Sequence, residues 1–406
     1  MSSTIVIAGA SLAGGRAAET LRRSGFEGRL ILVGQEPHRP YDRPPLSKKF
    51  LHHQQPEDKL FFRPESYYEE HKIELVLGTR AAALHASARE IELEGGRRVA
   101  FDQLLITTGA DVRKLTCEGA DLEGVHYVRT LEDSRALREE LRPGRRAVVI
   151  GAGVIGAEVA AACRQEGVEV VMVEVAELPL LRAFGPETAR LYADVHREHG
   201  VDLRCGAGVT ALRGARRVQE VLLSNGERVE CDFVVAGIGV RPAVTWLEGS
   251  GVAIEHGVLV DERCRTNVPG VFAAGDVSVF YSAAHGRHVA VESVDNAQTQ
   301  AICAAYNMTG KDAEHVPVPF FWSDQYDLKL QIVGHVGDYD RVAIRGSLAD
   351  RKLTIFHLAK DELRYAVGIN RLKEMGASKK LIATRAKVDA AALADESVSL
   401  ATFFPK

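Results

Sequence analysis

Short apolar runs alternate with helical stretches along the chain, and their order predicts the fold class. The apolar run Ala147–Ile150 predicts a buried strand, the Ala-rich stretch Ala157–Gln165 predicts a helix, and the apolar run Val168–Val173 predicts a second strand. Thr4–Ala8 and Leu30–Val33 are two further short apolar runs, and a helical stretch lies between them. Strands that alternate with helices are typical of parallel sheets. The sequence therefore predicts an α/β fold with two such units.

Three glycines connect the strand to the helix in the later unit. Gly151, Gly153 and Gly156 have the G-x-G-x-x-G spacing of dinucleotide-binding turns. The first two glycines let the backbone turn sharply and approach a pyrophosphate, the third lets the helix pack on the strand, and the helix N-terminus offers N–H groups to the anion. Glu174 ends the next strand, where a carboxylate can accept hydrogen bonds from both ribose hydroxyls and repel a 2′-phosphate. We therefore expect NADH in preference to NADPH, and a purely structural turn is the alternative.

A second glycine-rich turn follows the strand Thr4–Ala8. Its small residues are Gly9, Ser11, Ala13 and Gly14. Ser11 replaces the middle glycine and puts a side chain where backbone should approach a phosphate, although serine is small and its hydroxyl can itself form a hydrogen bond. Gln35 or Glu36, after the strand Leu30–Val33, can hold an adenosine ribose, and we favour Glu36. Two nucleotide-binding halves suggest two dinucleotides, of which FAD and NAD(H) are a natural pair; an unoccupied second unit is the alternative.

The two halves share further features. Phe101–Ala110 and Cys231–Gly239 are both strands that an aspartate leads and that end in small residues. Both follow hairpin-like segments, so the order of glycine turn, acidic strand end, hairpins and closing strand occurs twice. A later short strand stops at Gly275 and Asp276, and this aspartate can accept a hydrogen bond from a polyol such as a ribityl chain. We infer two homologous modules, the first of which is completed by chain that follows the second.

The rest of the chain contains two predicted helices and a third domain. Arg129 opens a charged helix that reaches Leu141, and Glu292 begins a helix that reaches about Tyr306. From Phe320 the composition shifts towards strands and then to an Ala-rich helical tail. The predicted strands cover residues 321–325, 328–333, 341–345, 352–358 and 363–369. This pattern predicts an α+β domain.

The segment Arg39–Lys48 contains three prolines, Pro40, Pro44 and Pro45. Proline fixes φ and disfavours helix in the residue before it, so we expect a stiff, extended segment with few helical options. Such a segment can hold side chains against a ligand. An ordinary surface loop is the alternative.

Length and composition restrict the class of protein. With 406 residues and about 100 to 200 residues per domain, two to four domains are expected. The chain is 46% hydrophobic and 26% charged, as is usual for globular proteins. A formal charge of −4 gives no argument for binding to nucleic acid or an anionic membrane. The first residues lack a basic stretch and a long apolar run, so we expect a cytoplasmic protein.

The cysteines, histidines and basic residues show no pattern typical of a metal or redox site. The six cysteines have no C-x-x-C or zinc spacing, and we expect buried thiols. His196 and His199 lie three apart on a predicted helix but lack the H-E-x-x-H arrangement, so we expect structural roles and no metal. Basic residues gather near the end, as a solvated face or as part of a docking surface for an acidic protein. They are Arg371, Lys373, Lys379, Lys380, Arg385 and Lys387.

Several of these segments together resemble the FAD-dependent, NADH-linked ferredoxin reductases of bacterial oxygenase systems, the family of putidaredoxin reductase and the biphenyl dioxygenase ferredoxin reductases. The resemblance covers nearly the whole chain. It depends on Arg39–Lys48, Arg129–Asp133, the Gly151 motif with Glu158, Ala274–Asp276, Glu292–Val294 and Phe321–Gln325. The proline-rich, Glu-Ser-Val and Trp-Ser-Asp-Gln segments are more specific than the glycine motifs, which many flavoproteins share.

The resemblance implies two Rossmann-like dinucleotide-binding domains, of the glutathione reductase type, and a C-terminal α+β domain. The implied domains are an FAD-binding domain at 1–110 and 240–320, an NAD-binding domain at 111–239 and a C-terminal domain at 321–406. The implied FAD contacts are Gly9, Ser11, Ala13, Gly14, Gln35 or Glu36, Arg43, Lys48, Ala81, Arg129, Gly275, Asp276, Glu292, Val294 and Trp322. The implied NADH contacts are Gly151, Gly153, Ile155, Gly156, Glu158, Glu174 and Gly239.

The implied reaction is hydride transfer from NADH to the flavin, followed by two single-electron transfers to a 2Fe-2S ferredoxin that supplies a haem monooxygenase or a ring-hydroxylating dioxygenase. Lys48 is implied beside flavin N5, where a cation stabilises the negative charge of reduced flavin. Glu158 is implied to meet the nicotinamide carboxamide or Lys48. A salt bridge that joins two domains is the alternative role of this pair.

Two other functions are open at this stage. A disulfide reductase or an NADH oxidase on the same fold needs a redox-active cysteine in the stretch Pro44–Lys48, but the first cysteine of the chain is Cys117. A redox-sensing flavoprotein that resembles apoptosis-inducing factor would control partner binding instead of turnover. No long insertion or targeting segment in the sequence favours that function.

Overall fold

The structure is a computed structural model, and it describes residues 3–282 and 287–405. The chain folds into two compact units. Unit 1 consists of Met1–Asp42, Pro56–Asp111 and Val240–Pro317, and unit 2 consists of Arg43–Gln55, Val112–Gly239 and Val318–Lys406. Each unit is therefore assembled from three separate segments of the chain.

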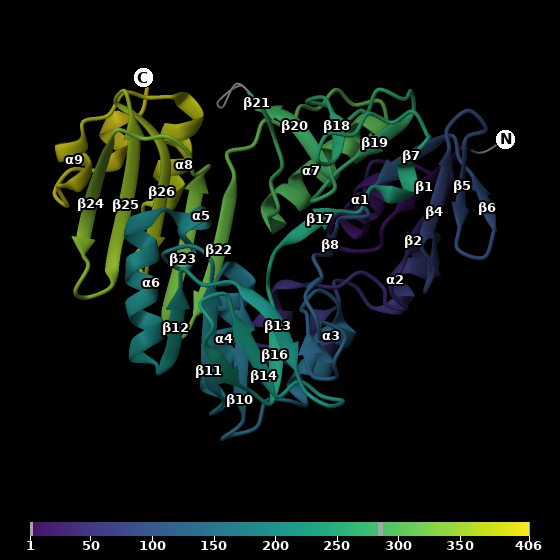
Figure 1. Ribbon diagram of the computed structural model, residues 1–406. Coiled ribbons are helices and arrows are strands. Elements are labelled where there is room, and N and C mark those ends of the chain that lie inside the picture. Colours follow the sequence, from purple (N-terminus) through teal and green to yellow (C-terminus); the bar gives the residue numbers. More distant parts are fainter. Residues whose placement is uncertain (1–2, 283–286, 406) are drawn as a thin grey trace. The chain divides into compact units, whose positions relative to one another are not determined.

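A five-stranded parallel sheet forms the centre of unit 1 (Figure 1). In spatial order its strands are β19 (Val271–Ala273), β7 (Gln103–Ile106), β1 (Thr4–Ala8), β2 (Arg29–Gly34) and β3 (Ile73–Leu77). The chain leaves β1 towards β2 on one side and later adds β7 on the other side. Open α/β sheets bind ligands outside the carboxyl ends of the strands at such a reversal of strand order.

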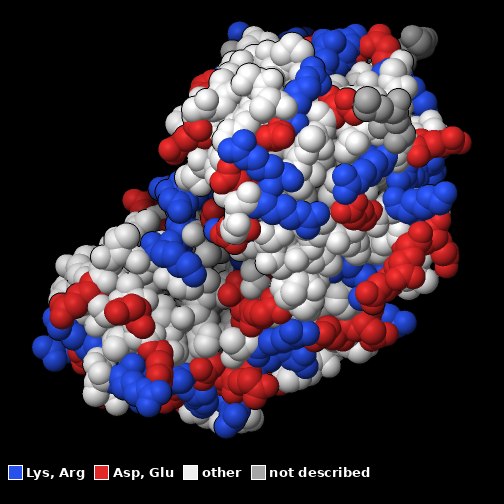
Figure 2. Space-filling model, turned by 90° about the vertical axis from the view of Figure 1, so that its right-hand side faces the viewer, with Lys and Arg blue, Asp and Glu red and all other residues white. Residues whose placement is uncertain are grey.

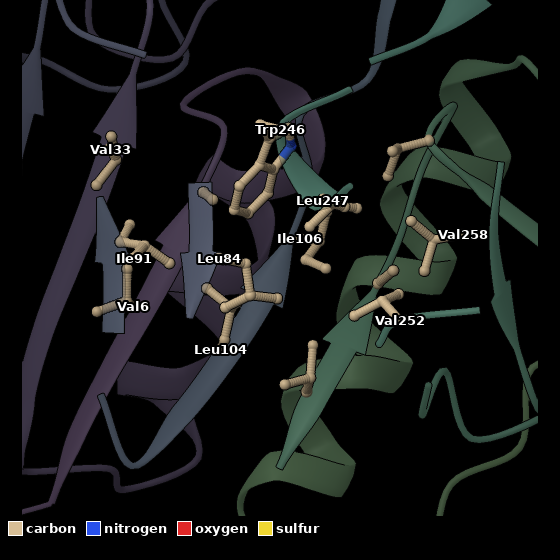
Figure 3. Packing of buried hydrophobic residues seen from close by; sticks show 14 of the residues in the cluster. Val6, Val33, Leu84, Ile91, Leu104, Ile106, Trp246, Leu247, Val252 and Val258 are labelled. Carbon is tan, nitrogen blue, oxygen red and sulfur yellow. The ribbon is translucent and has the colours of Figure 1, made fainter. Parts of the chain in front are cut away.

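Alternate side chains of β1 pack into two different layers. The layers are formed by helices α1 (Leu12–Arg23) and α7 (Val294–Met308), and by the antiparallel strands β4 (Ala81–His85), β5 (Glu90–Leu93) and β6 (Arg98–Ala100). Ile5 and Ile7 belong to the core cluster that contains the helices. Val6 belongs to the opposite cluster, with Leu84 and Trp246 (Figure 3). The period of two along the strand therefore gives the sheet two apolar faces.

The remaining elements that begin in unit 1 are short. They are η2 (Glu57–Leu60), α2 (Glu65–Glu70), β8 (Ala110–Val112), β17 (Val240–Pro242), η3 (Thr245–Leu247), β18 (Val258–Val260), β20 (Ser278–Ser282) and β21 (Arg287–Val289). Strands β18, β20 and β21 form one small sheet, and β8 and β17 form another. These elements extend the outer layers of the unit.

Unit 2 contains a second five-stranded parallel sheet. Its order is β12 (Val201–Cys205), β11 (Glu169–Glu174), β10 (Arg146–Ile150), β16 (Phe233–Ala236) and β9 (Val125–His126). The accompanying elements are α3 (Leu131–Arg138), α4 (Val154–Gln165), α5 (Leu181–Phe184), α6 (Pro186–Glu198), β13 (Val209–Arg213), β14 (Glu220–Leu223) and β15 (Arg228–Glu230). The last three strands form an antiparallel sheet, as β4, β5 and β6 do in unit 1. The expected repetition of one plan is thus present in the topology.

The C-terminal part of unit 2 is an antiparallel sheet covered by short helices. Its strands, in spatial order, are β22 (Phe320–Gln325), β23 (Leu328–Gly334), β26 (Glu362–Ile369), β25 (Lys352–Ala359) and β24 (Arg341–Ser347). The helices are α8 (Met375–Thr384), α9 (Ala390–Ala394) and η4 (Leu400–Phe403). One core cluster joins side chains of this sheet, such as Tyr365, to Ala157 of α4 and Tyr192 of α6.

The predicted fold class is confirmed: two parallel sheets follow the two glycine-rich turns, and an α+β region ends the chain. The predicted C-terminal strands match β22 to β26 closely. Three helix boundaries differ by two or more residues: α3 ends at Arg138 and not at Leu141, α4 begins at Val154 and not at Ala157, and α7 begins at Val294 and not at Glu292. Helix ends depend on local capping and fraying, which apolar periodicity does not determine.

The extended conformation predicted for the proline-rich segment is wrong in its second half. Residues Pro44–Ser47 form the 3₁₀ helix η1, with proline in its first turn. Proline has no backbone N–H to donate and a φ near −65°, and both properties suit the first turn of a helix. The adjacent prolines thus start a helical turn, which places Ser47 in the interior and Lys48 at its end.

Buried histidines should make the free energy of unfolding depend on pH. His196, His315 and His357 are at most 8% exposed, and burial lowers the pKa of each to about 4. The unfolded chain, with a pKa near 6.5, then binds more protons than the folded chain between about pH 6.5 and 4, so stability falls as the pH drops through this range. We expect acidification from pH 7 to 5 to cost about 2 kcal/mol per histidine, measured by urea unfolding. Replacing His315 by Gln should remove its share, and an unchanged pH dependence would contradict the assignment.

Candidate functional site

The two glycine-rich turns have equivalent backbone geometry. A Cβ added to Gly14 would lie 1.9 Å from the carbonyl oxygen of Gly9, and a Cβ added to Gly156 would lie 1.9 Å from that of Gly151. In each unit the last glycine of the turn is therefore required by the close approach of the helix to the turn before it. Gly9 and Gly151 also have positive φ values, of 125° and 91°. The turns are thus built in the same way in both units.

The middle position of the turn differs, and it indicates a ligand. A Cβ added to Gly153 would meet nothing within 4 Å, so packing inside the protein does not require glycine there. Gly153 is the N-cap of α4, no side chain caps this helix, and its first turn holds no acidic residue. Ser11 has the same place before α1 and also caps no backbone N–H. Both helix N-termini can therefore donate N–H groups to an anion, which fits the pyrophosphate of a dinucleotide.

The predicted ribose-binding acids lie at the carboxyl ends of the central strands. Glu174 is the last residue of β11, and its carboxylate accepts hydrogen bonds from the backbone N–H groups of Ala152 at 2.7 Å and Ala176 at 2.9 Å. Glu36 follows β2, and it accepts a hydrogen bond of 2.6 Å from the hydroxyl of Tyr41. The bond from Ala152 holds the Glu174 carboxylate beside the glycine-rich turn of unit 2, and the bond from Tyr41 fixes the Glu36 carboxylate after β2.

The other predicted residues of unit 1 lie on the same side of its sheet or at nearby element ends. Gly275 and Asp276 follow β19, Glu292 and Val294 lie at the start of α7, Gln35 is exposed after β2, and Ala81 starts β4. Sequence reasoning missed Gln300 of α7. Its Oε1 accepts hydrogen bonds from the Gly275 N–H at 2.8 Å and from the Ser278 hydroxyl at 2.7 Å, so it orients the turn that carries Asp276. A glutamine inside a helix gives no signal for such a role in the sequence.

In unit 2 the structure brings Lys48 and Glu158 together. Glu158 lies on α4, and its side chain is 2% exposed. Lys48 Nζ lies 3.1 Å from Glu158 Oε1, and the hydroxyls of Ser47 and Ser323 donate to the same carboxylate at 2.6 and 2.7 Å. Burial raises the pKa of Glu158, whereas the charge of Lys48 and the two hydroxyl donors act to lower it. The carboxylate is therefore buried with one cation and two donors.

Other predicted residues of unit 2 are linked to this pair through Trp322 or through η1. Lys48 Nζ lies 5.7 Å from the ring centroid of Trp322, on β22. The guanidinium of Arg43 donates a hydrogen bond to the backbone carbonyl of Arg129, before α3. The hydroxyl of Ser134 in α3 donates to the carbonyl of Leu46 at 2.8 Å and so fastens η1 to that helix. Arg43, Lys48, Arg129, Glu158 and Trp322 are thus connected within one unit.

Exposed apolar residues mark the carboxyl edge of the parallel sheet in unit 2. Ile155, Val175 and Ile238 are 41%, 66% and 37% exposed. Ile155 lies in the first turn of α4, Val175 follows β11, and Ile238 follows β16 beside Gly239, which is also exposed. Ile155 and Gly239 are among the predicted NADH contacts, whereas Val175 and Ile238 are not. Their signal is an apolar side chain directly after the end of a buried strand, where the rings of a nucleotide can cover it.

The basic residues near the end of the chain do not form one free cluster. Arg371 is buried and pairs with Glu374 and Glu396. Arg385 and Lys387 both pair with Glu362. These pairings favour local ion pairs over a docking surface made of all six residues. On the face shown in Figure 2, which is the right-hand side of Figure 1, acidic and basic side chains are interspersed.

The described residues show neither a membrane-spanning helix nor a metal cluster. In 3–282 and 287–405 no helix has the length and apolar character that crossing a bilayer requires. The same residues contain no group of three or more His, Cys, Asp or Glu side chains that could hold a metal ion.

Comparisons with known proteins cover nearly the whole chain. Residues 3–301 match the family model described as pyridine nucleotide-disulphide oxidoreductase, and residues 320–404 match the model described as reductase C-terminal. Rhodocoxin reductase of Rhodococcus erythropolis is 36% identical over 98% of this chain and 93% of its own length. The ferredoxin–NAD(+) reductase component of the anthranilate 1,2-dioxygenase system of Burkholderia cepacia is 39% identical over 98% of both chains. The reductase in the covalent putidaredoxin reductase–putidaredoxin complex superposes with a TM-score of 0.96 at 35% identity, covering 99% of this chain and 98% of that chain.

The ion pair of Lys48 and Glu158 can be tested by its effect on stability. Removing one partner of a buried pair leaves an uncompensated charge, so Lys48→Met should lower the free energy of unfolding by about 3 kcal/mol at pH 8. The loss should shrink as the pH is lowered, because protonation of Glu158 removes its charge. Urea unfolding measures both effects. The double variant Lys48→Met/Glu158→Gln should recover most of the loss, and a double variant no more stable than Lys48→Met would contradict the pairing.

Proposed function

The chain belongs to the pyridine nucleotide-disulphide oxidoreductase family, and from that premise we propose that it is an FAD-containing reductase that takes hydride from NADH and passes single electrons to a 2Fe-2S ferredoxin. The observation that carries this proposal is similarity over the full length, C-terminal region included, to ferredoxin–NAD(+) reductases of oxygenase systems. The ferredoxin in turn supplies a haem monooxygenase or a ring-hydroxylating dioxygenase. A cytoplasmic location is part of the proposal, because NADH is a cytoplasmic coenzyme.

We assign the two dinucleotides to the two glycine-rich turns. FAD is assigned to the domain formed by 1–110 and 240–320, NADH to 111–239, and the C-terminal domain is 321–406. The residues proposed to hold FAD are Gly9, Ser11, Ala13, Gly14, Gln35 or Glu36, Arg43, Lys48, Ala81, Arg129, Gly275, Asp276, Glu292, Val294 and Trp322. Those proposed to hold NADH are Gly151, Gly153, Ile155, Gly156, Glu158, Glu174 and Gly239. The open backbone at Gly153 and the uncapped N-termini of α1 and α4 support these assignments.

The chemistry divides between the cofactor and the protein. Bound FAD supplies a group that accepts two electrons at once and releases them singly. The protein binds and orients: the N-terminal N–H groups of α1 and α4 stabilise pyrophosphate charge, and Glu36 and Glu174 accept hydrogen bonds from ribose hydroxyls. Lys48 would place a positive charge beside the flavin, where it would favour the gain of electrons by the cofactor. Glu158 holds the Lys48 ammonium in place.

The alternative of a disulfide reductase or NADH oxidase is disfavoured by the cysteines. The segment Arg43–Gln55 contains none, and all six cysteines of the chain are free. Burial raises the pKa of Cys163 and Cys231 to about 12, so these thiols stay protonated and unreactive. A redox sensor of the apoptosis-inducing-factor type remains a distinct outcome of the test below.

Anaerobic spectroscopy tests the proposed electron path. The purified protein should show a flavin spectrum that bleaches when NADH is added. The spectrum should recover when oxidised putidaredoxin or rhodocoxin is then supplied as a probe ferredoxin. Bleaching without recovery for both probes would argue for the sensor function, and a protein that binds no flavin would overturn the proposal.

Coenzyme choice tests the role of Glu174. Since its carboxylate repels a 2′-phosphate, Glu174→Ala should raise the efficiency of NADPH relative to NADH about tenfold or more, in line with the loss of one charged interaction. The ratio of kcat/KM for the two coenzymes measures this. Glu169→Ala, at the other end of β11, serves as the matched control and should leave the ratio unchanged. A wild-type enzyme that prefers NADPH would contradict the assignment.

A further inference from the structure

Glu158 ends a chain of buried hydrogen bonds that runs to helix α6. Ser323 Oγ lies 2.7 Å from Glu158 Oε1, and Gln325 Nε2 lies 3.1 Å from Ser323 Oγ. On the other side of the amide, His196 Nε2 lies 3.0 Å from Gln325 Oε1, and His196 Nδ1 lies 3.2 Å from Tyr326 Oη. Ser323, Gln325 and His196 are at most 1% exposed. The chain is thus shielded from water over most of its length.

Only one direction of hydrogen-bond donation along this series is compatible with an ionised Glu158. An ionised carboxylate only accepts, so the Ser323 hydroxyl donates to it, and the Ser323 oxygen accepts from the Gln325 amide N–H. The Gln325 carbonyl oxygen then needs a proton from His196 Nε2, which leaves His196 Nδ1 to accept from the Tyr326 hydroxyl. Every donor points towards Glu158. Reversal of the whole chain would require Glu158 to be protonated and His196 to carry its proton on Nδ1.

We propose that Gln325 and His196, acting through Ser323, are positioning residues that keep Glu158 ionised and aimed at Lys48. The inference extends the function proposed above, because Lys48 is the cation assigned to the flavin. Several aligned hydrogen bonds together favour the ionised form of one buried carboxylate over its protonated form. It gives a role to the serine and glutamine of the Trp-Ser-Asp-Gln segment and to a histidine that the sequence marked only as structural.

This series of hydrogen bonds orients the charge of Glu158 and does not conduct protons. A primary amide passes a proton only through its unfavourable imidic acid form, so Gln325 interrupts any transfer between His196 and Ser323. Burial also lowers the pKa of His196 to about 4, which keeps its ring neutral at working pH. A neutral ring with one donor and one acceptor nitrogen is what the arrangement requires.

The charged and titratable groups around these hydrogen bonds favour the same direction of donation, towards Glu158. Lys48 is the cation that faces Glu158. Burial, and secondly the charge of Glu158, raise the pKa of Tyr192 of α6, so its hydroxyl stays neutral. His199 stacks on Tyr326 with ring centroids 3.7 Å apart, at the far end of the chain. The charged groups Asp324 and Asp327 also act on Tyr192, and Arg164 acts on Tyr326. Lys48 is the cation that pairs directly with the Glu158 carboxylate.

The tautomer of His196 gives a direct test on the purified protein. Nitrogen-15 NMR of histidine-labelled protein distinguishes protonated from unprotonated ring nitrogens, and the signal lost in His196→Gln identifies the residue. We expect the Nε2–H tautomer at pH 7, without titration between pH 7 and 5. Lys48→Met should favour protonation of Glu158 and so increase the Nδ1–H form. An Nδ1–H tautomer in the wild type, or titration near pH 6.5, would overturn the proposal.

Kinetics give a second readout, which a merely structural role would not produce. In stopped flow, the rate of flavin reduction by NADH should fall at low pH as Glu158 is protonated. Gln325→Leu and His196→Leu should move this acidic limb up by about half to one pH unit, since they remove donors from the chain. His196→Gln, whose amide can replace the Nε2 donor, should stay close to wild type.

The kinetic and NMR experiments together distinguish a failure of the positioning role from a failure of the proposed reductase function. An acidic limb at the same pH in the wild type, Gln325→Leu and His196→Leu would overturn the positioning role while leaving the reductase function intact. Wild-type protein whose flavin NADH does not reduce would instead overturn the proposed function, and the NMR result would still decide the direction of the chain. If the leucine variants do not fold, the wild-type tautomer and its response to Lys48→Met decide the question.

Discussion

The buried carboxylate of Glu158 is the constraint on which the arrangement of unit 2 depends. A charge inside a protein costs several kcal/mol unless a counter-ion and hydrogen-bond donors compensate it. The charge of Glu158 is compensated by Ser47 and Lys48, from the N-terminal part of the sequence, and by Ser323, from the C-terminal part. These segments must meet at α4 for the carboxylate to be tolerated. This requirement explains why Arg43–Gln55 folds with unit 2, although the chain on both sides of it belongs to unit 1.

Apolar contacts reinforce the same placement. Leu51 lies in the core cluster of the second parallel sheet, with Leu137 of α3. The guanidinium of Arg138 lies 4.4 Å from the ring centroid of Phe50. The proline-started turn η1 therefore delivers Lys48 to Glu158 from a segment that is anchored on both sides. A lysine held in this way, in a segment without cysteine, leaves the flavin as the redox group of the proposed reaction, which suits one-electron transfer to a ferredoxin and not reduction of a disulfide.

The two parallel sheets have the same kind of glycine-rich turn between their central strand and the following helix. In both, a glycine lets a helix approach the preceding turn so closely that a Cβ would lie 1.9 Å from a carbonyl oxygen. In both, the following helix has an N-terminus without a side-chain cap, and an acid stands near the end of the next strand. The middle position, Ser11 in one and Gly153 in the other, is where the two turns differ. Close helix packing is thus the shared requirement, and the position proposed to face a phosphate is the part that varies.

Much of the fold could be predicted from the sequence, because its signals are local. Apolar runs, glycine spacing and turn residues determine strands such as Arg146–Ile150, the turns that follow them and the α+β character of the last region. The family and its reaction class also followed from short motifs. The helical turn at Pro44–Ser47 was mispredicted, because proline suits both an extended segment and the start of a helix, and only the contacts of η1 decide between them.

Only the tertiary structure determined which of the predicted residues contact one another. Ser47 and Glu158 are 111 residues apart in sequence, and Ser323 and Glu158 are 165 apart, yet each pair shares a hydrogen bond. The sequence identified Lys48 and Glu158 as candidates but left open whether they pair, and it gave no sign that Gln300 or His196 supports a functional turn or charge. Periodicity and spacing describe a residue's immediate neighbours along the chain. Partners of a buried polar group are chosen by the packing of distant segments, which the sequence determines only through the complete fold.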